Sequence, residues 1–289
     1  MALDGKLNII AEKINDSVPS THELFEQGRI DDIILLAKEQ AEQGGRYIDV
    51  NIGLKEPRLM QELVTRIQSL VSVPLSIDTP SVEIAELALK AYDTRKANGE
   101  KPLLNSISLS RLEMFDLLKI QPFKVILMSN ERVVDGKPAM NKAAGDVLEA
   151  ALHMHEIAKR HGIENDDIIL DPSIAPIASD TRGYTKMTVD GITLLGREPK
   201  FKGCHISVGL SNFTHMLPTK TKSGAMVKTP LENAFLTITV PNGLDYCVGN
   251  TKKKYEFLAD DHPALQTLRT ALTLEGVGVV SCVRKFYNS

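Results

Sequence analysis

Tryptophan is absent from the sequence, aromatic residues make up only 5% of its 289 positions, and cysteine occurs three times. Cys204, Cys247 and Cys282 form no CxxC pair and have no histidine at a zinc-ligand spacing, so neither a disulfide framework nor a structural metal site is indicated. No apolar run approaches the roughly 18 residues of a membrane-spanning helix, and residues 1–10 lack the charged-then-apolar order of a signal peptide. We therefore expect a cytoplasmic protein with no membrane partner.

An excess of charge of either sign is also missing. The formal net charge is −3, whereas a nucleic-acid-binding protein usually carries a strongly basic face, so we expect no nucleic-acid partner. The remaining composition is ordinary, with 43% hydrophobic and 25% charged residues, and the length suits one large domain. Since no composition break or low-complexity tract divides the chain, we expect a single domain over residues 1–289 that acts on a small molecule.

A carboxylate or amide side chain follows each of several short apolar runs. The run Leu75–Asp78 delivers Asp78 directly onto a turn, and the C-terminal end of a parallel strand is where such sheets bind their ligands. A single residue of this kind is more often a turn former or a helix cap. Five in succession favour a shared polar pocket, and the other four runs are at 47–51, 103–106, 168–171 and 205–212.

Strands and helices alternate along the chain in the order expected of parallel βα units. A helical pattern at 30–43 ends at Gly44-Gly45 and leads directly into the strand at 47–51. The same succession predicts strands near 7–11, 75–78, 103–106, 125–128, 168–171, 206–210 and 246–248, helices near 57–70, 82–92, 111–119, 142–160, 189–195 and 230–240, and polar loops at 93–101 and 130–138. Eight units favour an α/β fold, a single (β/α)8 TIM barrel. An open dinucleotide-binding sheet is disfavoured because IIAEKIND, at the end of the first strand, contains no GxGxxG.

The strand C-termini of a barrel converge, so the polar side chains that end the strands should line one cavity. A carboxylate accepts two parallel hydrogen bonds from a guanidine-like edge, so such a lining complements a flat heterocycle such as a pterin or a purine. A magnesium site is disfavoured because no histidine ends a strand, and we predict no metal. Lys13 is expected to pair with Glu12 rather than to form a Schiff base. The expected lining is Glu12, Asn15, Asp49, Asn51, Asp78, Asn105, Asp171 and Asn212.

Six segments of the chain resemble, in the same order, the motifs GERIN, DLNVG, LDST, INS, DPLILP and GLSN of the methyltetrahydrofolate:corrinoid protein methyltransferases, which are pterin-binding methyltransferases. The segments are IIAEKIND (9–16), YIDVNIG (47–53), LSIDTP (75–80), LLNSIS (103–108), ILDPSIAP (169–176) and VGLSNFT (208–214). The resemblance extends from Leu7 to about Val248 and implies a barrel like that of dihydropteroate synthase.

The resemblance implies an enzyme that moves a methyl group between N5 of tetrahydrofolate and the cobalt of a corrinoid protein by in-line displacement. Tetrahydrofolate or 5-methyltetrahydrofolate would be the pterin substrate, and cobalamin would be free or carried by the partner protein. A homodimer is expected from the family. Matching the motifs residue by residue places Asn212 beside N5 and makes Asn212 and Asp78 the catalytic residues. The pterin-binding residues would be Asp78, Asn105, Asp171, Asn212, Ser211, Asn51 and Glu12.

The chain departs from the family motif where AEK replaces GER, so Lys13 provides a point charge instead of the arginine fork. Dihydropteroate synthase is the alternative enzyme. Its pyrophosphate substrate calls for an NxTxDSF-type loop and a basic SRK-type segment, and this chain has AEKIND and LSNFT there. A non-catalytic pterin-binding module is the alternative of another class. The direction of transfer, the original methyl donor and the choice between tetrahydrofolate and tetrahydromethanopterin stay open.

Overall fold

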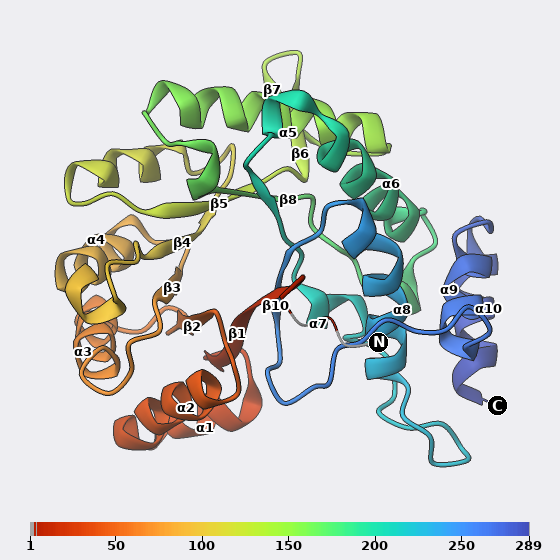
Figure 1. The fold of residues 1–289 in the computed structure, drawn as a ribbon, viewed down its shortest axis with the longest axis horizontal. Helices are drawn as coiled ribbons and strands as arrows, with labels where there is room; N and C mark the ends of the chain where they lie inside the picture. The colour runs from red at the N-terminus through yellow and green to blue at the C-terminus, as the bar shows by residue number, and fades with distance from the viewer. Residues whose placement is uncertain (1–2, 4, 289) are drawn as a thin grey trace.

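The computed structural model describes residue 3 and residues 5–288. Eight parallel strands lie side by side in the order β10-β1-β2-β3-β4-β5-β8-β9, and helices surround them (Figure 1). Consecutive strands of this sheet are therefore neighbours in space. The strands are β1 (Asn8–Asn15), β2 (Tyr47–Asn51), β3 (Leu75–Asp78), β4 (Leu103–Ile107), β5 (Lys124–Met128), β8 (Ile168–Asp171), β9 (His205–Ile206) and β10 (Tyr246–Gly249).

The edge strands β9 and β10 close the sheet through backbone contacts. The amide of Asp245 donates to the carbonyl of Ile206 at 3.2 Å, and the amide of Val248 donates to that of Val208 at 3.0 Å. One residue further, Gly209 forms a parallel bridge with Val248. The eight strands thus form a nearly closed barrel, which confirms the predicted TIM-barrel fold.

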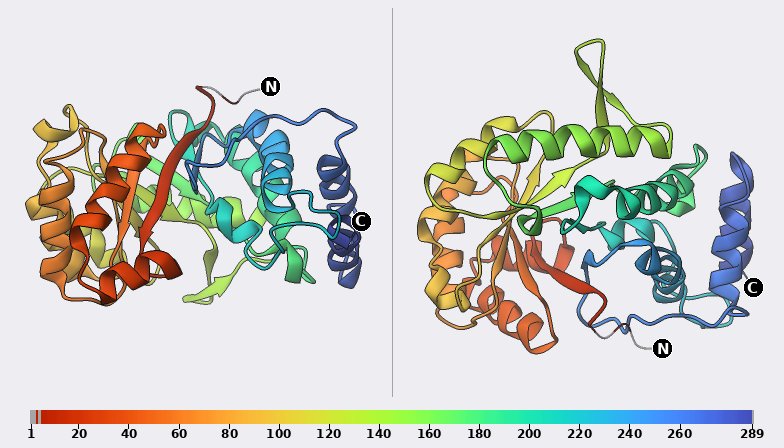
Figure 2. Two further views of the ribbon diagram at one scale, coloured as in Figure 1. Left: turned by 90° about the horizontal axis from the view of Figure 1, so that it is seen from below. Right: turned by 45° about the horizontal axis from the view of Figure 1, so that its top comes forward.

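The helices cover the outside of the barrel, and α9 and α10 pack at its edge beside α8 (Figures 1 and 2). None of the helices in the described part of the chain has both the length and the apolar character of a membrane span. The α-helices are α1 (Pro19–Glu26), α2 (Ile30–Glu42), α3 (Pro57–Ile67), α4 (Val82–Ala91), α5 (Ala144–Arg160), α6 (Tyr184–Arg197), α7 (Leu210–Phe213), α8 (Lys228–Thr239), α9 (Pro263–Ala271) and α10 (Val277–Asn288). Short 3-10 helices are η1 (Thr94–Ala97), η2 (Leu112–Lys119), η3 (Asn165–Asp167), η4 (Ile177–Ser179), η5 (Pro199–Phe201) and η6 (Val240–Asn242).

The helix α3 illustrates how the sequence specifies these covering helices. Pro57 occupies its first turn, where a missing backbone N–H costs nothing. Its buried residues recur at helical spacing on one face and have no exposed surface. This face packs on the outside of the barrel, and it consists of Met60, Leu63, Val64 and Ile67.

Two predicted elements were wrong. The segment 130–138, expected to be a polar loop, lies in an antiparallel hairpin of β6 (Glu131–Val134) and β7 (Lys137–Met140) that stands out beside α5 in Figure 2. Its turn, Asp135-Gly136, has positive φ at both residues, as a two-residue hairpin turn requires. The strand expected at 206–210 ends at Ile206, because the chain turns at Gly209 and begins α7 at Leu210.

Other boundaries also differed from expectation. The helix expected at 189–195 is the longer α6, and the helix expected at 111–119 is the 3-10 helix η2. The loop expected at 93–101 contains η1. The helices α1, α9 and α10 were not predicted. Helix α10 begins directly after Gly276, with no side chain at a capping position.

A glycine near the end of α6 is required for the close packing of that helix on η6. A Cβ at Gly196 would lie 2.2 Å from the backbone oxygen of Asn242, which cannot move aside freely. We expect Gly196→Ala to lower the free energy of unfolding by about 1–3 kcal/mol, as overpacking does. Gly145→Ala in α5 is the matched control, because a Cβ there meets nothing within 4 Å, and it should leave stability unchanged or raise it by less than about 1 kcal/mol. Urea unfolding of both variants measures the difference, and equal stabilities would contradict this packing.

Candidate functional site

The interior of the barrel consists of an apolar floor and a polar layer above it. Because side chains alternate between the two faces of a strand, the residue two positions after a floor residue points inward again, one layer nearer the strand C-termini. The floor is formed by Ile10, Tyr47, Leu103, Ile126, Ile169 and Tyr246, which pack together. The residues two positions later are Glu12, Asp49, Asn105, Met128, Asp171 and Val248, and all of them line one cavity.

This cavity has a volume of about 530 Å3, which is the size of a small-molecule site. Six of the seven residues that the sequence assigned to the site line it: Glu12, Asp78, Asn105, Asp171, Ser211 and Asn212. The seventh, Asn51, does not line the cavity but lies beside Asp78. The structure therefore brings these six side chains together from five separate elements, β1, β3, β4, β8 and α7.

Asn51 supports Asp78 through an amide whose orientation is fixed at both ends. Its Nδ2 donates to Oδ2 of Asp78 at 2.9 Å, and its Oδ1 accepts from the backbone N–H of Gly53 at 2.7 Å. Burial raises the pKa of Asp78, and the hydrogen bond from Asn51 opposes this rise. Asn51 thus stabilises the ionised carboxylate of Asp78 from outside the cavity.

Asp49 lies one layer below Asp78 and is 1% exposed. Nδ2 of Asn105 donates to its Oδ1 at 3.3 Å, so the carbonyl end of that amide is left for a ligand. Burial, and then the neighbouring charge of Asp78, raise the pKa of Asp49 well above its usual range. Ionising the two neighbouring carboxyl groups of Asp49 and Asp78 together is costly. We therefore interpret Asp49 as the protonated member of this pair.

Asp171 ends β8 and is held by two donors. The backbone N–H of Ser173 donates to its Oδ1 at 2.7 Å, and Oγ of Ser207 donates to its Oδ2 at 2.9 Å. Burial nevertheless raises the pKa of Asp171 to about 6. The carboxylate is therefore mostly ionised at neutral pH and retains lone pairs that can accept from a bound molecule.

Asn212 lies on α7 at the exposed rim of the cavity. The preceding residue, Ser211, donates from Oγ to Oε2 of Glu12 at 2.8 Å. Burial raises the pKa of Glu12, and the hydrogen bond from Ser211 opposes this rise. The expected pairing of Lys13 with Glu12 does not appear, because Nζ of Lys13 donates to Oγ of Ser20 at 2.8 Å.

Sequence reasoning missed one charged residue near the cavity. Arg111 donates to the hydroxyl groups of Ser106 and Ser108 at 3.3 Å, and its positive charge lowers the pKa of Asp78 against the effect of burial. It follows β4 in a loop that had been predicted to begin a helix. A lone arginine in a loop matches no motif, so only the folded backbone brings it beside the site.

The described residues contain no group of three or more His, Cys, Asp or Glu side chains arranged to hold a metal ion. The carboxylates of the cavity accept from amides and hydroxyls instead, as shown above for Asp78 and Asp171. This arrangement suits an organic ligand that presents hydrogen-bond donors.

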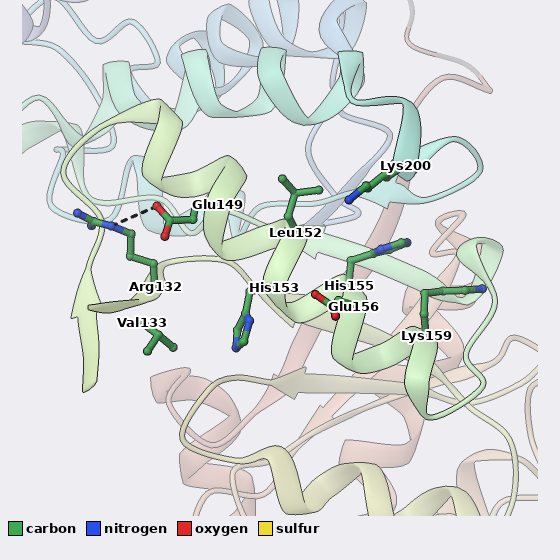
Figure 3. Close-up of a pocket in the computed structure, with 9 residues that line it drawn as sticks. All are labelled: Arg132, Val133, Glu149, Leu152, His153, His155, Glu156, Lys159 and Lys200. Atoms are coloured by element: carbon green, nitrogen blue, oxygen red, sulfur yellow. Dashed lines mark ion pairs between the residues drawn. The ribbon is translucent and has the colours of Figure 1, made fainter. Parts of the chain in front are cut away.

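A second hollow, about 520 Å3 in volume, lies on the outer face of α5 beside the β6–β7 hairpin (Figure 3). Several of its charged side chains already have partners. Arg132 pairs with Glu149 at 3.6 Å (Figure 3), and Glu156 pairs with Arg160 at 3.0 Å. Buried polar groups do not converge there as they do at the strand ends. We therefore take the strand-end cavity as the functional site.

The chain belongs to the pterin-binding enzymes, because residues 15–248 match the family model described as "Pterin binding enzyme". This match covers most of the chain and confirms the predicted family. A curated relative, the methylcorrinoid:tetrahydrofolate methyltransferase of Eubacterium limosum, is 27% identical over 251 residues that cover 83% of each chain. A dihydropteroate synthase of Synechocystis sp. is 25% identical over 216 residues that cover 68% of each chain.

Solved structures of dihydropteroate synthases have the same fold. The alignment with the enzyme from Xanthomonas albilineans in complex with 7,8-dihydropteroate covers 95% of this chain and 96% of that enzyme's chain. Its TM-score is 0.57, and the sequence identity is 16%. The alignment with FolP, the dihydropteroate synthase from Clostridium difficile in the presence of pteroic acid, covers 99% of this chain and 98% of that chain. Its TM-score and sequence identity have the same values. At this identity the likeness supports the barrel fold and does not extend to activity.

The raised pKa of Asp171 predicts a pH dependence of stability. The value is about 6 in the folded chain and 3.8 ordinarily, so between these pH values the folded state binds more protons than the unfolded state. The contribution of Asp171 to the free energy of unfolding should therefore fall as pH rises from about 4 to about 6, by roughly 3 kcal/mol at most. The difference in stability between the wild type and Asp171→Asn, from urea unfolding at pH 4 to 7.5, isolates this contribution.

Asp116→Asn provides the control with the opposite sign. The hydrogen bond from Lys119 lowers the pKa of Asp116, so the stabilisation by this carboxylate should grow as pH rises through the acid range. The quantity compared is the free energy of unfolding of the wild type minus that of each variant. If this difference for Asp171→Asn stays constant with pH, or rises with pH as it should for Asp116→Asn, the burial of an ionisable Asp171 is contradicted.

Proposed function

We propose that this pterin-binding enzyme transfers a methyl group between N5 of tetrahydrofolate and the cobalt of a corrinoid protein. The observation that carries the proposal is the position of Asn212 at the rim of the cavity whose inner wall holds Asp78, Asn105 and Asp171. The methylcorrinoid:tetrahydrofolate methyltransferase of Eubacterium limosum, 27% identical over most of both chains, supports this reaction class.

The inner wall complements the heterocyclic edge of a pterin. A pterin presents an amino group and ring N–H donors beside a carbonyl acceptor. Asp78 and Asp171 offer carboxylate oxygens for the donors, and a charge-assisted hydrogen bond is roughly twice as strong as a neutral one. The amide of Asn105 adds a carbonyl oxygen, since its Nδ2 is already engaged with Asp49. We assign pterin binding to these three residues, with Asn51 and Asp49 holding them in place.

Asn212 is assigned to N5 of the pterin. N5 is a poor leaving group unless it is protonated or strongly hydrogen-bonded, and an amide can present either a donor or an acceptor as the proton state changes. Toward tetrahydrofolate, the N5 lone pair forms the bond to carbon, the carbon–cobalt bond breaks with its electron pair on cobalt, and N5 loses its proton. The exposure of Asn212 at the rim leaves space for a corrinoid above the cavity.

The charge of the cavity favours methyl transfer over dihydropteroate synthesis. A pyrophosphate leaving group needs cations beside it, and no lysine or arginine is among the described residues that line the cavity. Two nearby cations act on its carboxyl groups without lining it, and both are engaged elsewhere. Arg111 acts on Asp78 and donates to the hydroxyl groups of Ser106 and Ser108. Lys253 acts on Glu12, and its Nζ donates to both oxygens of Glu232 at 2.6 and 2.8 Å. A methyl cation equivalent passing between neutral N5 and cobalt needs no such counter-charge.

Replacing Asn212 by alanine should reduce methyl transfer more than pterin affinity. An interaction made mainly in the transition state lowers kcat when it is lost, typically by about 10²-fold or more. The test is an anaerobic spectrophotometric assay with methylcob(III)alamin and tetrahydrofolate that follows the formation of Co(I), together with titration of tetrahydrofolate. We expect transfer by the wild type, a collapse of the rate in Asn212→Ala and similar affinity in both.

Gln61→Ala is the matched control, since it removes an amide from the exposed face of α3 outside the barrel, and its rate should equal that of the wild type. Tight tetrahydrofolate binding with no transfer, either from methylcobalamin or from a methylated corrinoid protein, would identify a non-catalytic module. Equal rates for the wild type and Asn212→Ala would refute the role of Asn212.

A further inference from the structure

Asn212 is carried by α7, a helix of only four residues. A single turn has almost no stability of its own, because helix nucleation is unfavourable. Its position therefore depends on contacts with the rest of the barrel. Leu210 and Phe213 supply the apolar part of these contacts, since both are fully buried and the ring of Phe213 packs 5.1 Å from that of Phe235.

On one side, α7 is tied to the first strand. Ser211 donates to Glu12 of β1 across 199 positions of sequence. Oε2 of Glu12 is the oxygen that accepts this bond, at 2.8 Å. The side chain that precedes Asn212 is thus fixed to a carboxyl group that lines the same cavity.

On the other side, α7 is tied to α8. Thr214, the residue after the helix, donates from Oγ1 to Oε1 of Glu232 at 2.6 Å, and Nζ of Lys253 donates to the same carboxylate. Glu232 has no exposed surface. A buried carboxylate is tolerated only when its hydrogen bonds and counter-charge are complete, so the loss of the Thr214 hydroxyl would disturb a closely constrained group.

Gly209 provides the space that Asn212 occupies. A Cβ at this position would lie 2.8 Å from Nδ2 of Asn212, closer than such contacts allow. The backbone of Gly209 has φ −73° and ψ 82°, and a negative φ of this size is open to alanine. Glycine is therefore required at this position because the Asn212 amide lies so close, and the backbone conformation does not require it.

We propose that α7 is a preorganised platform for Asn212, in which Glu12 and Glu232 are positioning residues acting through Ser211 and Thr214, and Gly209 leaves the space for the reactive amide. The proposal rests on the proposed function, since it concerns the reaction that Asn212 serves. A residue whose backbone is fixed before the reaction needs less reorganisation to reach its reactive position, whereas an amide displaced by about an ångström can lose on the order of a hundredfold in rate.

The central test is a double-mutant cycle of Gly209→Ala and Asn212→Ala. The added methyl group meets only the end of a flexible side chain, so Gly209→Ala should fold normally and keep its KM for tetrahydrofolate within about twofold, while kcat falls by about tenfold or more. In the Asn212→Ala background the same substitution should have no further effect. Gly145→Ala, where a Cβ meets nothing within 4 Å, is the control and should equal the wild type.

The two ties are tested by pairs of variants. Thr214→Val should lower kcat and Thr214→Ser should restore it, because serine keeps the hydroxyl that Glu232 accepts. Glu12→Ala should lower kcat and Glu12→Gln should restore most of it, since the amide oxygen can still accept from Ser211. In the Asn212→Ala background, the losses in Thr214→Val and Glu12→Ala should disappear. Losses that persist there would mean that these residues act independently of Asn212, which would overturn the proposal.

A second readout separates this proposal from the proposed function. The side-chain amide resonances of Asn212, identified by their absence in Asn212→Ala, report its position without turnover. They should shift in Gly209→Ala and Thr214→Val and stay in place in Gly145→Ala. If the wild type transfers no methyl group, the proposed function fails while these shifts still support the platform. Unchanged resonances in Gly209→Ala, or additive rate losses in the cycle, would overturn the platform even in an active enzyme.

Discussion

Burial of carboxyl groups in an apolar barrel is the constraint on which the site depends. Asp49 and Asp171 lie directly above a floor of hydrophobic side chains, and Asp78 lies one layer above Asp49. An ionised group in such a place is costly unless hydrogen bonds replace its lost water. One asparagine amide donates to Asp49 and another to Asp78, and a serine hydroxyl and a backbone N–H donate to Asp171. These donors do not offset burial fully, since the pKa of each carboxyl stays raised. A ligand rich in N–H donors would complete the set.

The alternation of side chains between the two faces of a strand explains how the fold buries these carboxyl groups. The six floor residues are apolar, and the next inward position on four of their six strands is polar, so the floor and the binding layer follow from one alternating pattern. On β3 the corresponding lower position is the buried Ser76. The seventh unit departs from it: β9 stops at Ile206, and the chain turns into α7. This break raises Asn212 to the rim, above the buried carboxylates and next to solvent.

Much of the barrel and of the site follows from local sequence. The bounds of β2 were predicted to the residue, because Gly44-Gly45 ends the preceding helix and the polar residues of the strand occur at its C-terminal end. Four of the seven predicted site residues, Glu12, Asp78, Asn105 and Asp171, line the cavity because they lie on barrel strands, whereas Ser211 and Asn212 line it from α7. The end of β9 was mispredicted because VGL continues an apolar run, and only the bridge from Gly209 to Val248 marks the turn.

Contacts between distant elements lay beyond sequence reasoning. The Asp135-Gly136 turn was a readable hairpin signal within the segment taken as a loop. By contrast, nothing local in the sequence pairs Ser211 with Glu12, or places Arg111 close enough to act on Asp78. Such contacts depend on the closure of the barrel, which sets side chains from separate strands against one another.

The most direct test of the account is whether the cavity recognises the donor edge of a pterin. We would measure by titration the affinity of a tetrahydropterin and of the corresponding lumazine, in which a carbonyl oxygen replaces the 2-amino group. A hydrogen bond to a charged group contributes about 1.5–3 kcal/mol, so the account predicts that the pterin binds at least about tenfold more tightly. Equal affinities, or tighter binding of the lumazine, would contradict the assignment of the buried carboxylates to pterin recognition.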